Sequence, residues 1–227
     1  MVFPVPEMNI LKSRRVNGWP LFYWIVGINS AAVIAYMPTQ DMSGPVGVSE
    51  MIQMSVRMSV PLLYLAFATA AMHILLPGTF TRWLLHNSRY IGLSYAASMA
   101  WQLLFILWMW TGHWEYYTTE VYLLEDIIFQ VGGYLFIFAM TITSFFPVRR
   151  RMSPLQWSVL HKTGIYWLWY TVASTYVYEV AYYDDRQVID YIFVVAGVLV
   201  YLTRVAAWIR SRTPHAVRQQ NSKAAGA

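Results

Sequence analysis

The residues best suited to chemistry in this sequence are three histidines that the hydrophobic pattern predicts to lie at one membrane depth. His73 stands near the end of an apolar segment, His86 in the connection that follows, and His161 at the start of a later segment, in "LQWSVLHKTG". Two neutral imidazoles that face each other across a gap can ligate the iron of a b-type haem. One hypothesis is therefore a haem site of His161 with His73 or His86. The alternative is interfacial anchoring, because an imidazole joins an apolar body to a polar tip.

Few other polar side chains interrupt the apolar segments. Gln102, in "SMAWQLLFILW", can hydrogen-bond to a neighbouring helix or contact a bound quinone, pigment or haem edge. Arg204 stands close enough to a segment end for its guanidinium to extend to the interface. The sequence has no cysteine, which excludes disulfides, zinc-thiolate sites, iron–sulfur clusters and covalently attached haem. No pattern identifies a catalytic residue or a metal site.

The elements that must position these residues are long apolar helices. The chain is 58% hydrophobic and 12% charged, and soluble domains carry about 25% charged residues. A membrane-spanning helix needs about 20 apolar residues. Six segments meet this requirement and predict an all-α integral membrane protein with a six-helix transmembrane domain over 19–209, between an N-terminal segment 1–18 and a polar tail 210–227. The six segments are Trp19–Met37, Ser59–Pro77, Tyr90–Trp110, Ile127–Phe146, Thr163–Tyr182 and Val188–Ile209.

The charged residues predict the orientation of these segments. Most basic residues fall in the termini and in the second and fourth connections, and most acidic residues fall in the other connections. The positive-inside rule then places both termini in the cytoplasm, with the bacterial inner membrane as the expected location. The densest basic cluster, Arg149, Arg150 and Arg151, is a determinant of topology or a docking surface for a cytoplasmic partner. Lipid headgroups account for the net charge of +5 without a nucleic-acid partner.

Two stretches resemble a known family. The segments "HNSRYIGLSYAASMAWQLLF" and "MTITSFFPVRRRMSPLQWSVLHKTGIY" are similar to spans three and five of ferric-reductase-like transmembrane domains. These domains include the haem-binding membrane subunit of the bacterial methionine-sulfoxide reductase system. The resemblance implies six helices with both termini inside, and b-type haems held between histidines of spans three and five.

The sequence departs from the ligand pattern that this resemblance implies. In the family, the two histidines of span five stand thirteen residues apart. His161 matches the inner position, but Ser174 occupies the outer one. On span three, Gln102 and Ser88 occupy the outer and inner positions. Serine and glutamine are poor haem ligands. We therefore expect no outer haem, and an inner haem only if His73 or His86 replaces Ser88.

Two interpretations follow from this pattern. The first is a haem-poor, non-catalytic accessory or assembly subunit of a larger membrane complex that transfers electrons or binds pigment. It would hold no cofactor, or a bound quinone, pigment or lipid. The second is a subunit that carries electrons through one b-type haem on His161 and receives them from a quinol or a flavoprotein.

Overall fold

The computed structural model describes residues 9–121, 124–182, 184 and 186–224, and the side chains of all of these except 9, 120, 121, 124–126, 146 and 213–224. The described residues form helices and no strand, which confirms the all-α fold class. The long helices are α1 (Trp19–Tyr36), α2 (Pro45–Leu75), α3 (Thr79–Gly112), α5 (Leu124–Thr143), α7 (Pro154–Tyr182) and α8 (Val188–Ala224). The short elements are α4 (Trp114–Tyr116), α6 (Phe146–Arg149), 3-10 turns at Asn9–Lys12, Arg14–Val16 and Met37–Thr39, and a π turn at Tyr117–Val121.

The long helices follow the predicted segments, and four of them are long and apolar enough to cross a membrane: α1, α2, α3 and α8. The apolar part of α5, Ile127–Thr143, is shorter. α7 has the length, but tyrosine, serine and threonine lower its mean hydropathy. The protein is therefore an integral membrane protein, and a count of six membrane crossings stays a prediction.

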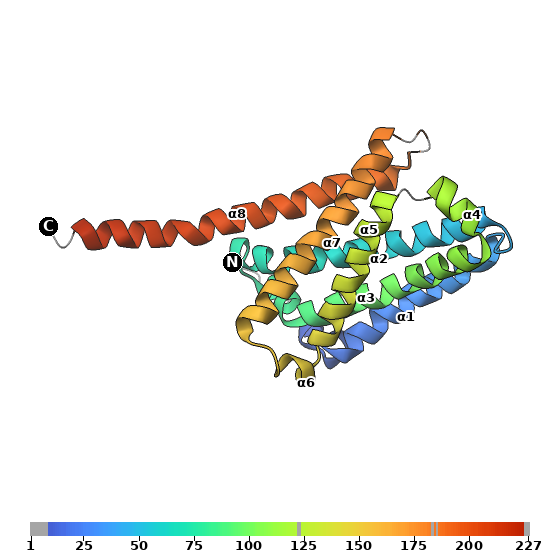
Figure 1. The fold of residues 1–227 in the computed structure, drawn as a ribbon. Coiled ribbons are helices and arrows are strands. Elements are labelled where there is room, and N and C mark those ends of the chain that lie inside the picture. Colours follow the sequence, from blue (N-terminus) through green and yellow to red (C-terminus); the bar gives the residue numbers. More distant parts are fainter. Residues whose placement is uncertain (1–8, 122–123, 183, 185, 225–227) are drawn as a thin grey trace, which may run out of the picture.

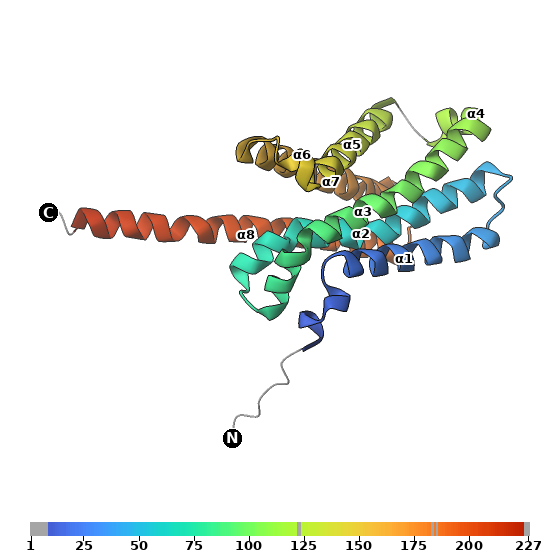
Figure 2. The same ribbon diagram turned by 90° about the horizontal axis from the view of Figure 1, so that it is seen from below.

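α2 lies at the centre of the bundle. It packs along α3 and α8 and also contacts α7. α1 lies on one side of α2 and α3, and the α5–α7 pair lies on the other side (Figures 1 and 2). α8 continues past the end of the bundle, so 210–224 prolongs the last helix rather than forming a separate element (Figure 1).

The buried side chains form two clusters along this bundle. One contains Val33, Met51, Phe105 and Met109, and the other contains Leu63, Tyr95 and Leu168 among its members. Large apolar side chains are also exposed along the outer faces, as Tyr23, Trp24 and Ile28 are on α1. Such faces suit a lipid environment, where the surrounding acyl chains are as apolar as the protein.

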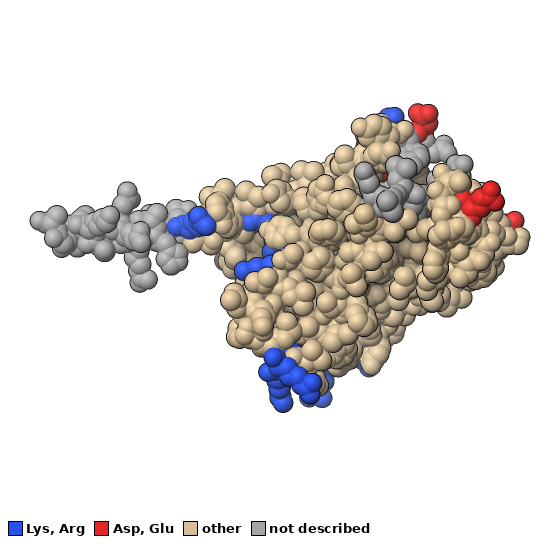
Figure 3. All heavy atoms as spheres, viewed as in Figure 1, with Lys and Arg blue, Asp and Glu red and all other residues tan. Residues whose placement is uncertain are grey.

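Basic and acidic side chains gather at opposite ends of the molecule (Figure 3). The basic end contains the α2–α3 and α5–α7 connections, with Arg82 in the first turn of α3 and Arg149–Arg151 between α5 and α7. The acidic end contains Asp41 and Glu115. Glu120, Glu125, Asp126 and Asp185, which the sequence assigns to the acidic end, lie outside the described side chains. The charge separation supports the predicted asymmetry, and the side that faces the cytoplasm stays a prediction.

Candidate functional site

A cavity of about 420 Å³ lies among the helices at the basic end of the bundle. Its lining comes from α2, α3, α5, α6, α7 and α8. Four basic side chains, Arg89, Arg149, Lys162 and Arg204, line it together with His161, and none of the described lining residues is acidic. The volume lies within the range of about 300–1,000 Å³ that is common for small-molecule sites.

The start of α7 places the histidine in this cavity. Ser153 and Gln156 form a capping box, with the Ser153 amide donating to Gln156 Oε1 at 3.0 Å and the Gln156 amide donating to Ser153 Oγ at 3.1 Å. Pro154 occupies the first helical position, which its fixed φ favours. The helical period then turns one face of α7 to the cavity. That face carries Trp157, Ser158, His161, Lys162, Ile165 and Leu168.

His161 is held by contacts on both its edge and its face. Its Nε2 lies 3.1 Å from Thr143 Oγ1, and that hydroxyl donates its hydrogen to the Ala139 carbonyl at 2.7 Å. Nε2 and the Thr143 hydroxyl therefore form a hydrogen bond whose direction depends on the tautomer of the imidazole. The imidazole stacks on Trp157 at 4.3 Å, and the Arg149 guanidinium covers the same indole at 4.6 Å. Nε2 is therefore engaged with Thr143 of α5.

The structure does not bring a second described histidine to this cavity. His73 Nδ1 lies 3.4 Å from Thr81 Oγ1, where α3 begins, and His86 is exposed on α3. Neither residue lines the cavity. Ser88 does line it, and its hydroxyl donates to the Leu85 carbonyl of its own helix at 2.9 Å. The described residues therefore do not fit a haem held between two imidazoles.

Gln102 lies away from this cavity, near the middle of α3. It is 7% exposed, and its Oε1 accepts a hydrogen bond of 2.8 Å from the Tyr134 hydroxyl of α5. This contact corresponds to the interhelical alternative, and Gln102 does not line the cavity. Ser174, at the other outer ligand position, is exposed and donates to the Thr171 carbonyl at 3.0 Å.

Arg204 turns into the bundle rather than extending to the interface. Its Nη1 donates to the Phe67 carbonyl at 3.1 Å, and the guanidinium lies over the rings of Phe67 and Tyr166 at 4.4 and 4.6 Å. Such cation–π contacts favour the charged form of a guanidinium away from water. Arg150 and Arg151 are exposed and do not line the cavity.

Two polar atoms on the cavity wall have no hydrogen-bond partner among the described residues. They are the hydroxyl of Tyr95, a side chain only 4% exposed, and Nε1 of Trp157. A buried donor without a partner costs about 1–3 kcal/mol, so native structures contain few of them. Sequence patterns could not reveal these two donors, because lacking a partner is a property of the packed side chain.

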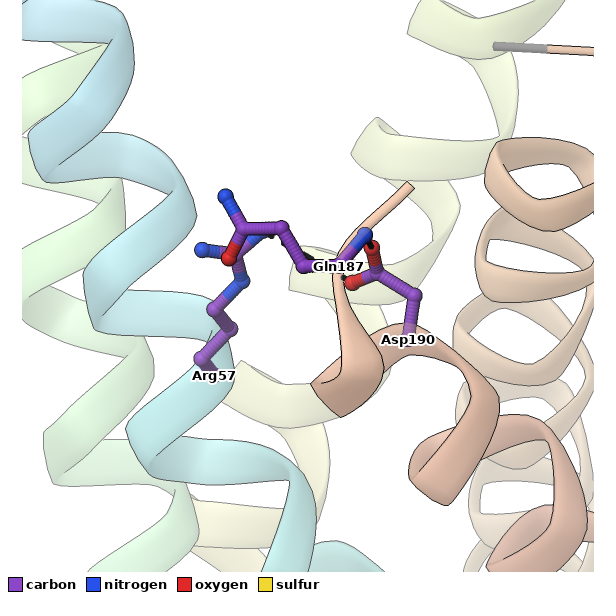
Figure 4. A network of polar contacts seen from close by, with 3 residues as sticks. All are labelled: Arg57, Gln187 and Asp190. Carbon is purple, nitrogen blue, oxygen red and sulfur yellow. Dashed lines mark hydrogen bonds and ion pairs between the residues drawn. The ribbon is translucent and has the colours of Figure 1, made fainter. Parts of the chain in front are cut away.

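A second polar site joins α2 to α8 toward the acidic end of the bundle (Figure 4). Arg57 Nη2 lies 3.6 Å from Asp190 Oδ1, and the Gln187 amide donates to Asp190 Oδ2 at 2.9 Å. Nothing in the sequence pattern pairs Arg57 with Asp190. Asp190 caps the first turn of α8, which is a structural role.

No protein-family model, no curated protein and no solved structure matches the chain. The similarity to ferric-reductase-like domains therefore rests on the two sequence stretches quoted above. Among the described residues, no three His, Asp or Glu side chains lie close enough together to hold a metal ion.

Proposed function

We propose that this protein is a non-catalytic accessory or assembly subunit of a larger membrane complex, and that its inner cavity holds a ligand other than haem. The observation that carries the proposal is the state of His161. It is the one imidazole among the described lining residues, and its Nε2 is hydrogen-bonded to Thr143. A b-type haem held between two imidazoles needs a second histidine, which the described lining of the cavity does not supply.

The proposal includes a relationship to the ferric-reductase-like domains, with six membrane crossings and both termini in the cytoplasm of a bacterium. The two similar sequence stretches and the separation of charge along the bundle support it. The complex is one that transfers electrons or binds pigment, as the similarity implies. Arg150 and Arg151, which are exposed beside the cavity, form the docking surface for a cytoplasmic partner.

A visible spectrum of the protein purified from haem-replete cells tests the ligand part of this proposal. We expect no b-type band in the dithionite-reduced minus air-oxidised difference spectrum, and the same result for His161→Ala. A stoichiometric b-type band would overturn the proposal. If the band disappeared in His161→Ala, the electron-transfer interpretation would replace it.

Co-purification in a mild detergent tests the accessory role. We expect a defined set of other membrane proteins at constant stoichiometry, and weaker retention of them with the double variant R150Q/R151Q. Arg82, an exposed basic residue in the first turn of α3, supplies the matched control R82Q. Isolation of the chain alone at every detergent strength would contradict an accessory role.

A further inference from the structure

We propose that the inner cavity binds the phosphate group of an anionic membrane phospholipid, with the lipid's acyl portion running into the apolar depth of the bundle. This inference rests on the proposed function in one respect only, namely that haem does not occupy the cavity. The charge of the lining, its excess of donors and its polarity gradient each point to this ligand.

The positive charge of the cavity lining favours an anionic ligand. Arg89, Arg149, Lys162 and Arg204 contribute positive charge to one cavity, and none of its described lining residues is acidic. Arg149 and Lys162 are exposed, whereas Arg89 and Arg204 are half-buried. Like charges repel more strongly where water is scarce, because the effective dielectric constant is lower than in bulk water. Charged groups within a membrane bundle therefore pair with a counter-charge. A phosphate group would supply it.

The hydrogen-bond donors of the cavity lining favour a ligand that carries hydrogen-bond acceptors. Arginine, lysine and the tryptophan indole carry donors and no acceptors. The Trp157 Nε1–H lies beside Arg149, in the stack that also contains His161, and it has no described partner. Phosphate oxygens accept several hydrogen bonds at once, and arginine binds them with particular strength. A neutral quinone offers only two carbonyl oxygens and no charge.

The polarity of the cavity changes with depth. Ser88, Arg149 and Trp157 line the basic end, whereas Leu63, Ile137 and Leu168 line the part nearer the middle of the bundle. Tyr95 lies about 10 Å further along α3 than Ser88, at about 1.5 Å per residue. At that depth its hydroxyl, which has no described partner, can donate to the ester carbonyl of an acyl chain.

The cavity also reaches the outer surface of the bundle. Ala70 of α2 and Leu85 of α3 line it and are exposed. An acyl chain can therefore enter from the bilayer between apolar residues on the side of the bundle. A free phosphate ion would use only the basic end and would leave Tyr95 without a partner. These features favour a phospholipid over a soluble phosphate.

The test measures binding of short-chain phosphatidylglycerol to the purified full chain in a neutral detergent, with phosphatidylcholine of the same chain length and inorganic phosphate as comparisons. We expect phosphatidylglycerol to raise the melting temperature in a saturable manner, and the two comparisons to raise it far less. Mass spectrometry of the purified protein should detect a bound anionic phospholipid.

Two pairs of variants assign the binding to the cavity. Arg149→Gln should weaken phosphatidylglycerol binding about five- to tenfold, whereas Arg150→Gln, which changes an adjacent exposed cation outside the cavity, should leave it unchanged. Tyr95→Phe should weaken binding about three- to tenfold and leave the lipid-free protein at least as stable as before, because it removes a buried hydroxyl that has no described partner. Tyr64→Phe, which loses a 3.1 Å hydrogen bond to the Phe193 carbonyl outside the cavity, should lower stability and leave lipid binding unchanged.

Three results would overturn this inference while the proposed function stood. They are equal binding of phosphatidylglycerol and phosphatidylcholine, equal stabilisation by inorganic phosphate, and a quinone recovered in place of a phospholipid. Equal loss of binding in the Arg149 and Arg150 variants would also overturn it, since that result would indicate general attraction to the basic surface. A b-type haem band would instead overturn the proposed function itself.

Discussion

Arg57 of α2 and Asp190 of α8 form an ion pair of 3.6 Å in which the aspartate side chain is 5% exposed and the arginine side chain 23% exposed. The same two helices are joined again further toward the basic end, where Arg204 of α8 donates to the Phe67 carbonyl of α2. α8 is therefore attached to the central helix at two depths. The attachment nearer the basic end also fixes the guanidinium of Arg204, which lines the inner cavity.

Breaking the Arg57–Asp190 pair from one side should be costly. Arg57→Met or Asp190→Asn alone leaves the other charge without its partner, and we expect either change to lower the free energy of unfolding by about 3 kcal/mol. The double variant should lose less than the sum of the two single losses, since neither charge then remains. Thermal unfolding in detergent measures all four proteins, and strictly additive losses would show that the pair is not coupled.

Asn87 connects the N-terminal segment to α3. The side chain is fully buried, accepts from the Gly18 amide at 2.9 Å and donates to Asn17 Oδ1 at 2.9 Å. Asn87→Ala should lower the free energy of unfolding by about 1–3 kcal/mol, because it leaves the half-buried Gly18 amide and Asn17 Oδ1 without this partner. Limited proteolysis should then cut near residues 10–18 more rapidly. Ser88→Ala is the control, because it removes a hydrogen bond within α3 only. It should leave the free energy of unfolding almost unchanged.

Gly47 is required where α2 begins. A Cβ atom at this position would overlap the backbone carbonyl of Asp41, which cannot move away as a flexible side chain could. Gly47→Ala should therefore destabilise the protein by about 1–3 kcal/mol. Gly27→Ala in α1 is the matched control, because a Cβ there meets no atom within 4 Å and alanine favours a helix. Equal melting temperatures for the two variants would contradict this prediction.

The turn before α2 should be sensitive to acid. The hydroxyl and amide of Ser43 donate to Asp41 Oδ1 at 2.6 and 3.0 Å, and these bonds lower the pKa of Asp41 below its usual value. The ionised carboxylate therefore stabilises the folded state above the ordinary aspartate pKa, and this contribution disappears as the pH falls through the lowered pKa. Melting temperatures measured from about pH 6 to about pH 3 should fall less steeply in Asp41→Asn than in the unchanged protein. Parallel slopes would count against the proposed linkage.

The Gln102–Tyr134 contact should contribute to helix association rather than to cofactor binding. A double-mutant cycle of Gln102→Leu and Tyr134→Phe should give a coupling free energy of about 0.6 kcal/mol, which is typical of hydrogen bonds between membrane helices. Phosphatidylglycerol binding should not change in either variant, since neither residue lines the cavity. Loss of lipid binding in Gln102→Leu alone would show that Gln102 takes part in ligand binding.

The prediction of helices succeeded because its signals are local. A run of apolar residues determines that a segment is helical and lies in the membrane, and the α1 and α8 segments were recovered to within a few residues at their N-terminal ends. The ends of α2 and α3 differ more, since both helices continue into polar sequence that hydropathy does not mark. α2 begins at Pro45 rather than at Ser59, and α3 begins at Thr79 rather than at Tyr90.

The partners of the polar side chains were not predictable in the same way. By itself, the sequence determined an all-helical membrane protein with charge separated between its ends, and it singled out His161. Only the tertiary structure decided that His161 contacts Thr143, that Arg204 turns inward onto Phe67, and that Arg57 meets Asp190. Each of these contacts depends on how far one helix is rotated and shifted against another. That relation is determined by the shapes of all the side chains between the helices, and no single segment contains it.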